Sequence, residues 1–337
     1  MSGTRARAEV PTRLLVHALV REDGTVDAGE LYEVAGILGM SDQQVRLCVK
    51  RLVAEGRFTH EGRGRKAVLR AVADATGAIA PDVGHVRHAY RQDHGLAPWD
   101  GTWHLFAFAV PEARRAARDT LRDKLLRLGA APVQGGLYAS ANPIEDLVEA
   151  EARHLGVLPA VTFLTSEDLR IGTLREPREL AASLWPLKEI AGRYDRLSTL
   201  AESCLEEMNG TEGGRDTGGA GEAGRGARGE AGRGARGEAG RGARGEANGP
   251  CVPEAERLTM AVELAAEFTR AMEPDPLLPP ELLPHPWPGS RARELAATCW
   301  SRLAAPESQK PKPEREPGSL PSLFSLYGDV LRPPTDT

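Results

Sequence analysis

The side chains with the clearest chemical meaning are basic residues gathered between Ser41 and Ala71. This window holds eight lysines and arginines against three acids, on a chain whose net charge is −5 at pH 7. A local excess of five positive charges on an acidic protein is typical of a site that binds nucleic-acid phosphates. The basic residues are Arg46, Lys50, Arg51, Arg57, Arg63, Arg65, Lys66 and Arg70.

A helix and a β-hairpin are predicted to position these side chains. Ser41 and Gln44 form the pattern S-x-x-Q, a capping box that begins a helix ending at Gly56. Residues 57–72 then predict two short strands around the turn 62–64. The helix has one apolar face, made of Val45, Val49, Leu52 and Val53. Its other face is left with polar and basic side chains.

Two helices are predicted before this one, over residues 12–20 and 27–38, with a turn at Asp23-Gly24. Three helices followed by a basic hairpin is the order of a winged helix-turn-helix, expected over residues 10–72. A helix fits the DNA major groove, and cations on the wing can reach phosphates. The candidate DNA-binding residues are Gln43, Gln44, Arg46, Lys50, Arg51, Arg63, Arg65 and Lys66. The alternative is a solvated amphipathic helix whose charges only keep the protein soluble.

The middle of the chain, residues 99–175, changes to a regular alternation of strands and helices. Strands are predicted at residues 103–110 and 160–167, and a strand with a Gly135-Gly136 bend at 132–140. The amphipathic segments between them, 111–130 and 144–156, predict helices. This β-α-β-α-β run predicts a small ferredoxin-like α+β domain with one strand short or unrecognised.

The last third of the chain predicts a helical domain built from residues 176–208 and 252–305. Helical periodicity covers residues 178–207, 253–272 and 290–305, and a Pro-rich extended segment covers 275–289. The whole chain is therefore expected to be an α+β multidomain protein, with a winged-helix, a ferredoxin-like and a helical part.

Three segments are not expected to form core. Residues 73–98 are interpreted as a linker with one short helix, and residues 306–337 as a disordered tail with a short segment LFSLYGDVL. Residues 209–251 contain the octapeptide GEAGRGAR three times in succession and almost no large apolar side chain. Such a segment cannot offset its backbone entropy and is expected to be disordered. It is either a neutral repeat expansion or a weak contact to DNA or RNA.

Composition argues against several other classes of protein. No apolar run of about 18 residues and no signal peptide is visible, so no membrane association is expected and the cytoplasm is the expected location. The four cysteines form no C-x-x-C pair, so they predict packing residues rather than a disulfide or zinc framework. His85, His88 and His94 are scattered, and no metal or cofactor is expected.

The alternative hypothesis is that the protein is an enzyme, a metal-dependent nuclease that uses the middle domain. Such chemistry needs carboxylates at a strand end to hold Mg²⁺. The strand at 103–110 ends without an acid, Asp100 precedes it, and Glu112 is better explained as an acid of a helix first turn. No Ser/His/Asp set, G-x-S-x-G or phosphate loop is present, so no catalytic residue is predicted.

Three separated stretches resemble the PaaX family, repressors of phenylacetic acid catabolism and related regulators. They are VRLCVKRLVAEGRFTHEGRGRKAVLR, APWDGTWHLFAF and DPLLPPELLPHPWPG. The first resembles the family's recognition helix and wing, the second its W-D-G-x-W entry to the central domain, and the third its C-terminal signature. The wing departs from the family in having KAVLR where aromatic residues are more frequent.

The resemblance implies a winged-helix domain, a central domain similar to the small CRISPR-adaptation nuclease fold, and a helical C-terminal domain. It also implies a homodimer that represses an aromatic or acyl-CoA catabolic operon from double-stranded operator DNA. Release by phenylacetyl-CoA or another aryl- or acyl-CoA is implied as well. The effector, the operator and the regulated genes stay open, as do an activator and a regulator without a ligand.

The C-terminal signature offers candidate residues for binding such an effector. Trp287 could supply an apolar wall, and Arg291 and Arg293, at the start of the following helix, could meet phosphate. The alternative is that Trp287 and the surrounding prolines only lock a domain interface.

Overall fold

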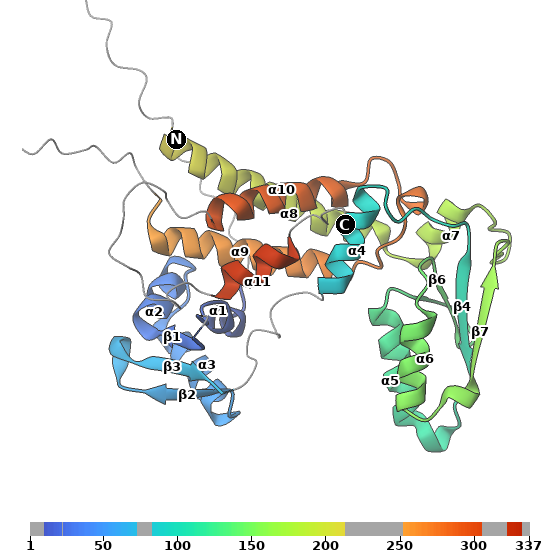
Figure 1. Cartoon of the computed structure of the whole chain (residues 1–337), viewed down its shortest axis with the longest axis horizontal. Coiled ribbons are helices and arrows are strands. Elements are labelled where there is room, and N and C mark those ends of the chain that lie inside the picture. The colour runs from blue at the N-terminus through green and yellow to red at the C-terminus, as the bar shows by residue number, and fades with distance from the viewer. Residues whose placement is uncertain (1–9, 22, 73–82, 213–251, 305–321, 332–337) are drawn as a thin grey trace, which may run out of the picture.

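The computed structural model describes residues 10–21, 23–72, 83–212, 252–304 and 322–331. Its elements form three groups (Figure 1): an N-terminal unit, a sheet covered by two helices at the opposite end, and long helices between them. Both sheets are antiparallel, one of three strands and one of four. This mixture of helices and separate antiparallel sheets agrees with the predicted α+β class.

The N-terminal unit combines three helices with a three-stranded sheet of order β1-β3-β2. Its elements are α1 (Thr12–Ala18), β1 (Thr25–Asp27), α2 (Ala28–Ile37), α3 (Asp42–Ala54), β2 (Phe58–Glu61) and β3 (Val68–Ala71). Strand β1 was not predicted, because three residues are too few to show an alternating pattern. It pairs with β3 through Val26 and Leu69, and both side chains are buried.

The N-terminal unit is not isolated from the rest of the chain. Helix α2 packs against α9 (Glu254–Met272), and Figure 1 shows the unit beside that helix. One apolar cluster includes Leu15 and Leu31 of the unit together with Leu264 of α9. Burying apolar side chains from both sides stabilises this arrangement.

The central unit contains four strands in the order β5-β6-β4-β7 and two covering helices. The elements are β4 (Trp103–Phe108), α5 (Arg115–Arg127), β5 (Ala131–Gln134), β6 (Leu137–Ser140), α6 (Glu145–His154) and β7 (Val161–Ser166). The prediction of a single bent strand over residues 132–140 is wrong. Gly135 and Gly136 have φ values of +56° and +86°. Positive φ at both central residues is the geometry of a type I′ hairpin turn, so the chain turns back here and forms β5 and β6.

The C-terminal helices also differ from the prediction at one place. The continuous helix expected over residues 178–207 is two helices, α7 (Pro177–Leu184) and α8 (Leu187–Glu212). Pro186 separates them, because proline has no N–H to donate and clashes with the preceding turn. Helix α10 (Pro288–Ala304) packs against both α8 and α9.

Two short helices from segments that were expected to be peripheral lie on this bundle. Helix α4 (Val83–Asp93) comes from the predicted linker, packs against α10 and α11, and buries Val86, Ala89 and Tyr90. Helix α11 (Ser322–Val330) comes from the predicted disordered tail. Its Tyr327 ring lies 5.2 Å from the ring of Trp300. Both segments therefore contribute to the core.

Residues 73–82, 213–251, 305–321 and 332–337 lie outside the described residues. They include the GEAGRGAR repeats and most of the predicted tail. Among the described helices, none combines the length and the apolar character that crossing a lipid bilayer requires.

Candidate functional site

The first turn of α3 confirms the capping box that the sequence predicts. The Ser41 hydroxyl oxygen accepts a hydrogen bond from the backbone N–H of Gln44 at 3.3 Å, and the backbone N–H of Ser41 donates to Gln44 Oε1 at 2.8 Å. These bonds satisfy amide groups that a helix start otherwise leaves without partners. The carboxamide oxygen of Gln44 is therefore occupied by the helix itself.

The rest of α3 presents one buried and one exposed face. Val45 and Leu52 are buried in the core, at 0% and 1% exposure. Because they fix the rotation of the helix, the polar residues at the other positions face outward. All of Gln43, Arg46, Lys50 and Arg51 are exposed.

Leu47 is also exposed on this surface, at 50%, and was not among the predicted site residues. Its neighbours one turn away in the helix are Gln43, Gln44, Lys50 and Arg51. The sequence could have predicted this exposure, because Leu47 does not lie on the apolar face formed by Val45, Val49, Leu52 and Val53.

The connection between β2 and β3 carries three of the predicted cations. It spans residues 62–67, longer than the predicted turn at 62–64, and contains a short 3₁₀ turn, Gly64–Lys66. All three predicted cations, Arg63, Arg65 and Lys66, are exposed. The connection packs against α2, where the backbone oxygen of Arg65 lies 3.1 Å from the position that a Cβ on Gly29 would take.

Arg65 is the best anchored of these cations. Its guanidinium lies 3.9 Å from the Asp42 carboxylate and 5.9 Å from the centre of the Tyr32 ring. These contacts link the connection to the middle of α2 and to the N-terminal end of α3. The structure therefore exposes the predicted polar and basic residues of α3 and of the β2–β3 connection, and the contact of Arg65 with Asp42 joins the two elements.

The predicted effector residues do not form one group. Arg293 is buried, with a side chain only 5% exposed, and its guanidinium donates two hydrogen bonds of 2.6 Å to the Asp93 carboxylate. It also donates to the Tyr194 hydroxyl at 2.8 Å. Because these partners occupy it, Arg293 is not placed to meet a phosphate from solvent, and the expectation for this residue needs correction.

The network around Arg293 continues into the C-terminal signature. The Tyr194 hydroxyl donates to the Asp275 carboxylate, whose other oxygen accepts the backbone N–H of Leu277 at 2.8 Å. Burial, together with the charge of Asp275, raises the pKa of Tyr194 well above its usual value. The hydroxyl therefore stays protonated and remains a donor.

The same segment is held from the other side by the central unit and α4. The Asn142 side-chain amide donates to the backbone oxygens of Pro276 and Leu277 at 3.3 and 2.9 Å, and Gln92 donates to that of Leu277 at 2.8 Å. Leu277 has φ +52°, a conformation that costs a non-glycine residue about 1–2 kcal/mol. Hydrogen bonds at both its N–H and its oxygen compensate for this cost.

Close approach at Gly129 completes this junction. A Cβ at Gly129 would lie 2.6 Å from the backbone oxygen of Pro276, so only glycine fits. The Trp185 indole N–H donates to the Gly129 oxygen at 2.9 Å. The signature segment therefore joins the central unit, α4 and the C-terminal helices, and Asp275 has a structural role in this junction.

Trp287 and Arg291 do share a hollow of about 1030 Å³ between α4, α10 and α11. Tyr90, His94 and Trp300 also line it. Arg291 is 73% exposed and pairs with Glu202 at 2.7 Å. This hollow combines aromatic walls with one accessible cation.

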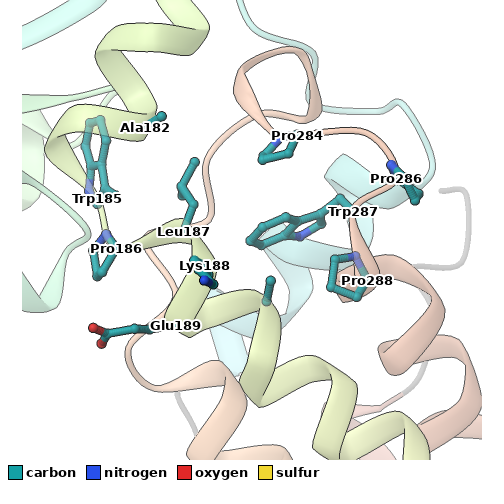
Figure 2. Close-up of a pocket in the computed structure, with 11 residues that line it drawn as sticks. Ala182, Trp185, Pro186, Leu187, Lys188, Glu189, Pro284, Pro286, Trp287 and Pro288 are labelled. Atoms are coloured by element: carbon teal, nitrogen blue, oxygen red, sulfur yellow. The ribbon is translucent and has the colours of Figure 1, made fainter.

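A second, more apolar hollow of about 570 Å³ lies on the other side of Trp287. Figure 2 shows the indole of Trp287 extending toward Leu187 at the start of α8, with Pro284 and Pro288 beside it. The Trp287 ring also meets Tyr194 edge-on, with ring centres 6.2 Å apart. Trp287 thus both lines hollows and packs against the junction.

The scattered histidines and Asp100 have structural partners. His85, His88 and His94 contact the Met272 oxygen, the Asn142 side chain and the Tyr90 oxygen, respectively. Asp100 accepts the backbone N–H of Thr102 at 2.8 Å and so closes a turn. Within the described ranges, no three His, Cys, Asp or Glu side chains lie close enough together to hold a metal ion.

Comparisons with known proteins match two parts of the chain to one family. The model of the PaaX protein central Cas2-like domain matches residues 96–181, and that of the PaaX-like protein C-terminal domain matches residues 244–310. No curated protein matches the chain. Among solved structures, the uncharacterized protein Rv0674 from Mycobacterium tuberculosis is similar, with 20% identity, a TM-score of 0.41, and coverage of 82% of this chain and 88% of that one. With the family's central and C-terminal domains matched in order along the chain, this chain belongs to the PaaX family.

Proposed function

We propose that this protein is a PaaX-like transcriptional regulator that binds double-stranded DNA through its N-terminal unit. The observation that carries the proposal is the exposed basic face of α3 beside the exposed cations of the β2–β3 connection. The order of elements, with three helices and a sheet whose last two strands form a hairpin, supports a winged helix-turn-helix. The central unit, with its β-α-β-β-α-β order, supports a ferredoxin-like domain.

In this proposal α3 enters the major groove. Gln43, Arg46 and Lys50 contact base edges, where one good bidentate contact discriminates by about 1–3 kcal/mol. Gln44 holds the helix start through the capping box, which limits it as a base contact. The backbone phosphates are contacted by Arg51, Arg63, Arg65 and Lys66. Arg65 lies 3.9 Å from Asp42, but this exposed pair is weak and can be exchanged for a phosphate contact.

The domain boundaries follow from the same arrangement. We assign residues 10–72 to DNA binding, 99–175 to the central domain, and 176–208 with 252–305 to the helical domain. The contacts of α4 with α10 and α11 support assigning residues 83–93, part of the expected linker 73–98, to the helical domain. We expect two copies of the chain to bind a palindromic operator as a homodimer, because two-fold symmetry of the protein matches two-fold symmetry of the site.

We further propose that the regulator is a repressor released by an aryl- or acyl-CoA. The hollow with Trp287 and Arg291 offers aromatic walls for an acyl group and a cation for phosphate. Helix α10, which lines the hollow, packs on α9, and α9 packs on α2. A ligand that prefers one arrangement of these helices would shift the population between free and DNA-bound shapes.

DNA binding is tested by selecting duplexes from a random library and titrating them against variants. Arg46→Ala should change the preferred sequence, and Arg63→Ala should weaken binding to every duplex. Arg153→Ala is the matched control, because Arg153 is an exposed arginine of α6 in the central unit, paired with Glu149. If Arg46→Ala and Arg63→Ala bind the selected duplex as tightly as the unchanged protein, the placement of α3 is wrong.

Effector binding is tested by thermal unfolding with a panel of CoA thioesters. A ligand at 100 times its dissociation constant adds about 2.7 kcal/mol to the free energy of unfolding. The stabilising thioester should also release the selected DNA, and Arg291→Ala should weaken both effects. Stabilisation that Arg291→Ala leaves unchanged would place the ligand elsewhere.

A further inference from the structure

Leu47 is an exposed leucine at the centre of the surface that we propose reads DNA. Its side chain is 50% exposed, although leucine gains stability from burial. Within the described N-terminal unit, the other large apolar side chain exposed to this degree is Val72, which follows β3. A single exposed leucine is common on protein surfaces, so exposure alone does not indicate a function. Whether Leu47 has a function depends on where it lies.

The position of Leu47 follows from the rotation of α3. Val45 and Leu52 are buried, which directs the opposite side of the helix to solvent. Residues three and four positions apart are neighbours on a helix surface, so Leu47 lies between Gln43 on one side and Lys50 and Arg51 on the other. These neighbours on the exposed face of α3 are polar or charged, so they give Leu47 no apolar partner.

The chemistry of the major groove supplies such a partner. Base edges there present hydrogen-bond donors and acceptors, and the one apolar group is the C5-methyl of thymine. Gln43, Arg46 and Lys50 suit the donors and acceptors. A leucine among them suits the methyl group, because contact removes two apolar surfaces from water.

We propose that Leu47 is a specificity-determining residue that packs on a thymine methyl and makes the protein prefer thymine at one position of its site. This inference rests on the proposed DNA-binding function and adds to it the identity of one base. It predicts that discrimination at that position depends on a methyl group and not on a hydrogen bond.

The test replaces each thymine of the selected duplex, one at a time, by deoxyuridine, which lacks only the C5-methyl. At one position, the unchanged protein should bind about three- to five-fold more weakly, as expected for losing one buried methyl contact. Leu47→Ala should bind thymine and deoxyuridine equally at that position. Val72→Ala, a matched change of an exposed apolar residue outside α3, should keep the full preference for thymine.

The outcomes distinguish failure of this inference from failure of the proposed DNA-binding function. If no duplex is selected, or if Arg46→Ala and Arg63→Ala have no effect, the DNA-binding function and the inference both fail. If those variants weaken binding but deoxyuridine has no effect at any position, or if Leu47→Ala keeps the preference, only the role of Leu47 is overturned. A change in oligomeric state of Leu47→Ala with the preference intact would likewise overturn it and identify Leu47 as a contact between copies.

Discussion

The Arg293 guanidinium and the Asp93 carboxylate, 200 positions apart in the chain, form two hydrogen bonds of 2.6 Å. Their side chains are only 5% and 11% exposed. The pair fastens α4, which follows the N-terminal unit, to α10 in the C-terminal bundle. Tyr194 and Asp275 extend it to the signature segment, so several parts of the fold depend on one buried arginine.

Removing Arg293 should therefore be costly. Arg293→Met keeps much of the side-chain volume but leaves the Asp93 and Asp275 carboxylates buried without their counter-charge. Breaking a buried pair in this way costs about 3–5 kcal/mol of the free energy of unfolding, measurable by urea denaturation. Arg291→Met, on the same helix but exposed, is the control and should cost about 0–1 kcal/mol. Similar losses for both variants would contradict the buried network.

The close contact at Gly129 gives a second prediction. Gly129→Ala must accommodate a positive φ of +85° and a Cβ only 2.6 Å from the Pro276 oxygen. Gly101→Ala is a matched control, because Gly101 also has φ +85° but nothing lies within 4 Å of its Cβ position. Both variants carry the backbone cost of about 1–2 kcal/mol, and Gly129→Ala should lose about 1–3 kcal/mol more in thermal unfolding. Equal losses would show that the junction is looser than the structure indicates.

His88 should make stability depend on pH. Burial lowers the pKa of His88, although its hydrogen bond to Asn142 opposes the shift. When the pH is below 6.5, the ordinary pKa of histidine, His88 binds a proton in the unfolded chain but not yet in the folded protein. This contribution to stability is therefore complete above that value and is lost as the pH falls through the lowered pKa.

The matching measurement compares melting temperatures at about pH 7.5 and about pH 5. His88→Gln can still donate to Asn142 but does not titrate, so it should lose less stability on acidification than the unchanged protein. Identical losses in both proteins would mean that other groups carry the pH dependence.

The capping box of α3 should matter for both stability and DNA binding. Ser41→Ala removes the acceptor for the Gln44 N–H and should cost about 1 kcal/mol, measured by thermal unfolding. Under the proposed function, it should weaken binding of all duplexes alike, because it loosens the helix start without changing a base contact. A changed sequence preference in this variant would indicate that Ser41 or Gln44 contacts bases directly.

Salt dependence separates phosphate contacts from base contacts. Lys66→Ala should lower the slope of log affinity against log salt concentration by about one unit, because one fewer counterion is released. Gln43→Ala should leave the slope unchanged while altering sequence preference. An unchanged slope for Lys66→Ala would remove the β2–β3 connection from the DNA interface.

The sequence by itself determined the local features whose causes lie within a few residues. The capping box at Ser41 and Gln44 and the exposed polar face of α3 follow from side-chain chemistry and helical spacing, and the structure has both. The same is true of the strands of the central unit, apart from the hairpin at Gly135-Gly136. There the two glycines were interpreted as a bend within one strand, although Gly-Gly is also a signal for a two-residue hairpin turn.

Only the tertiary structure decided which distant residues meet. Arg293 was expected to meet phosphate because it lies at the start of a helix, yet Asp93 and Tyr194 come from other helices and bury it. Segments 83–93 and 322–330 looked peripheral because each is too short to show its apolar face convincingly. They become core because α9 and α10 provide the surfaces that cover that face, and such surfaces exist only once the chain has folded.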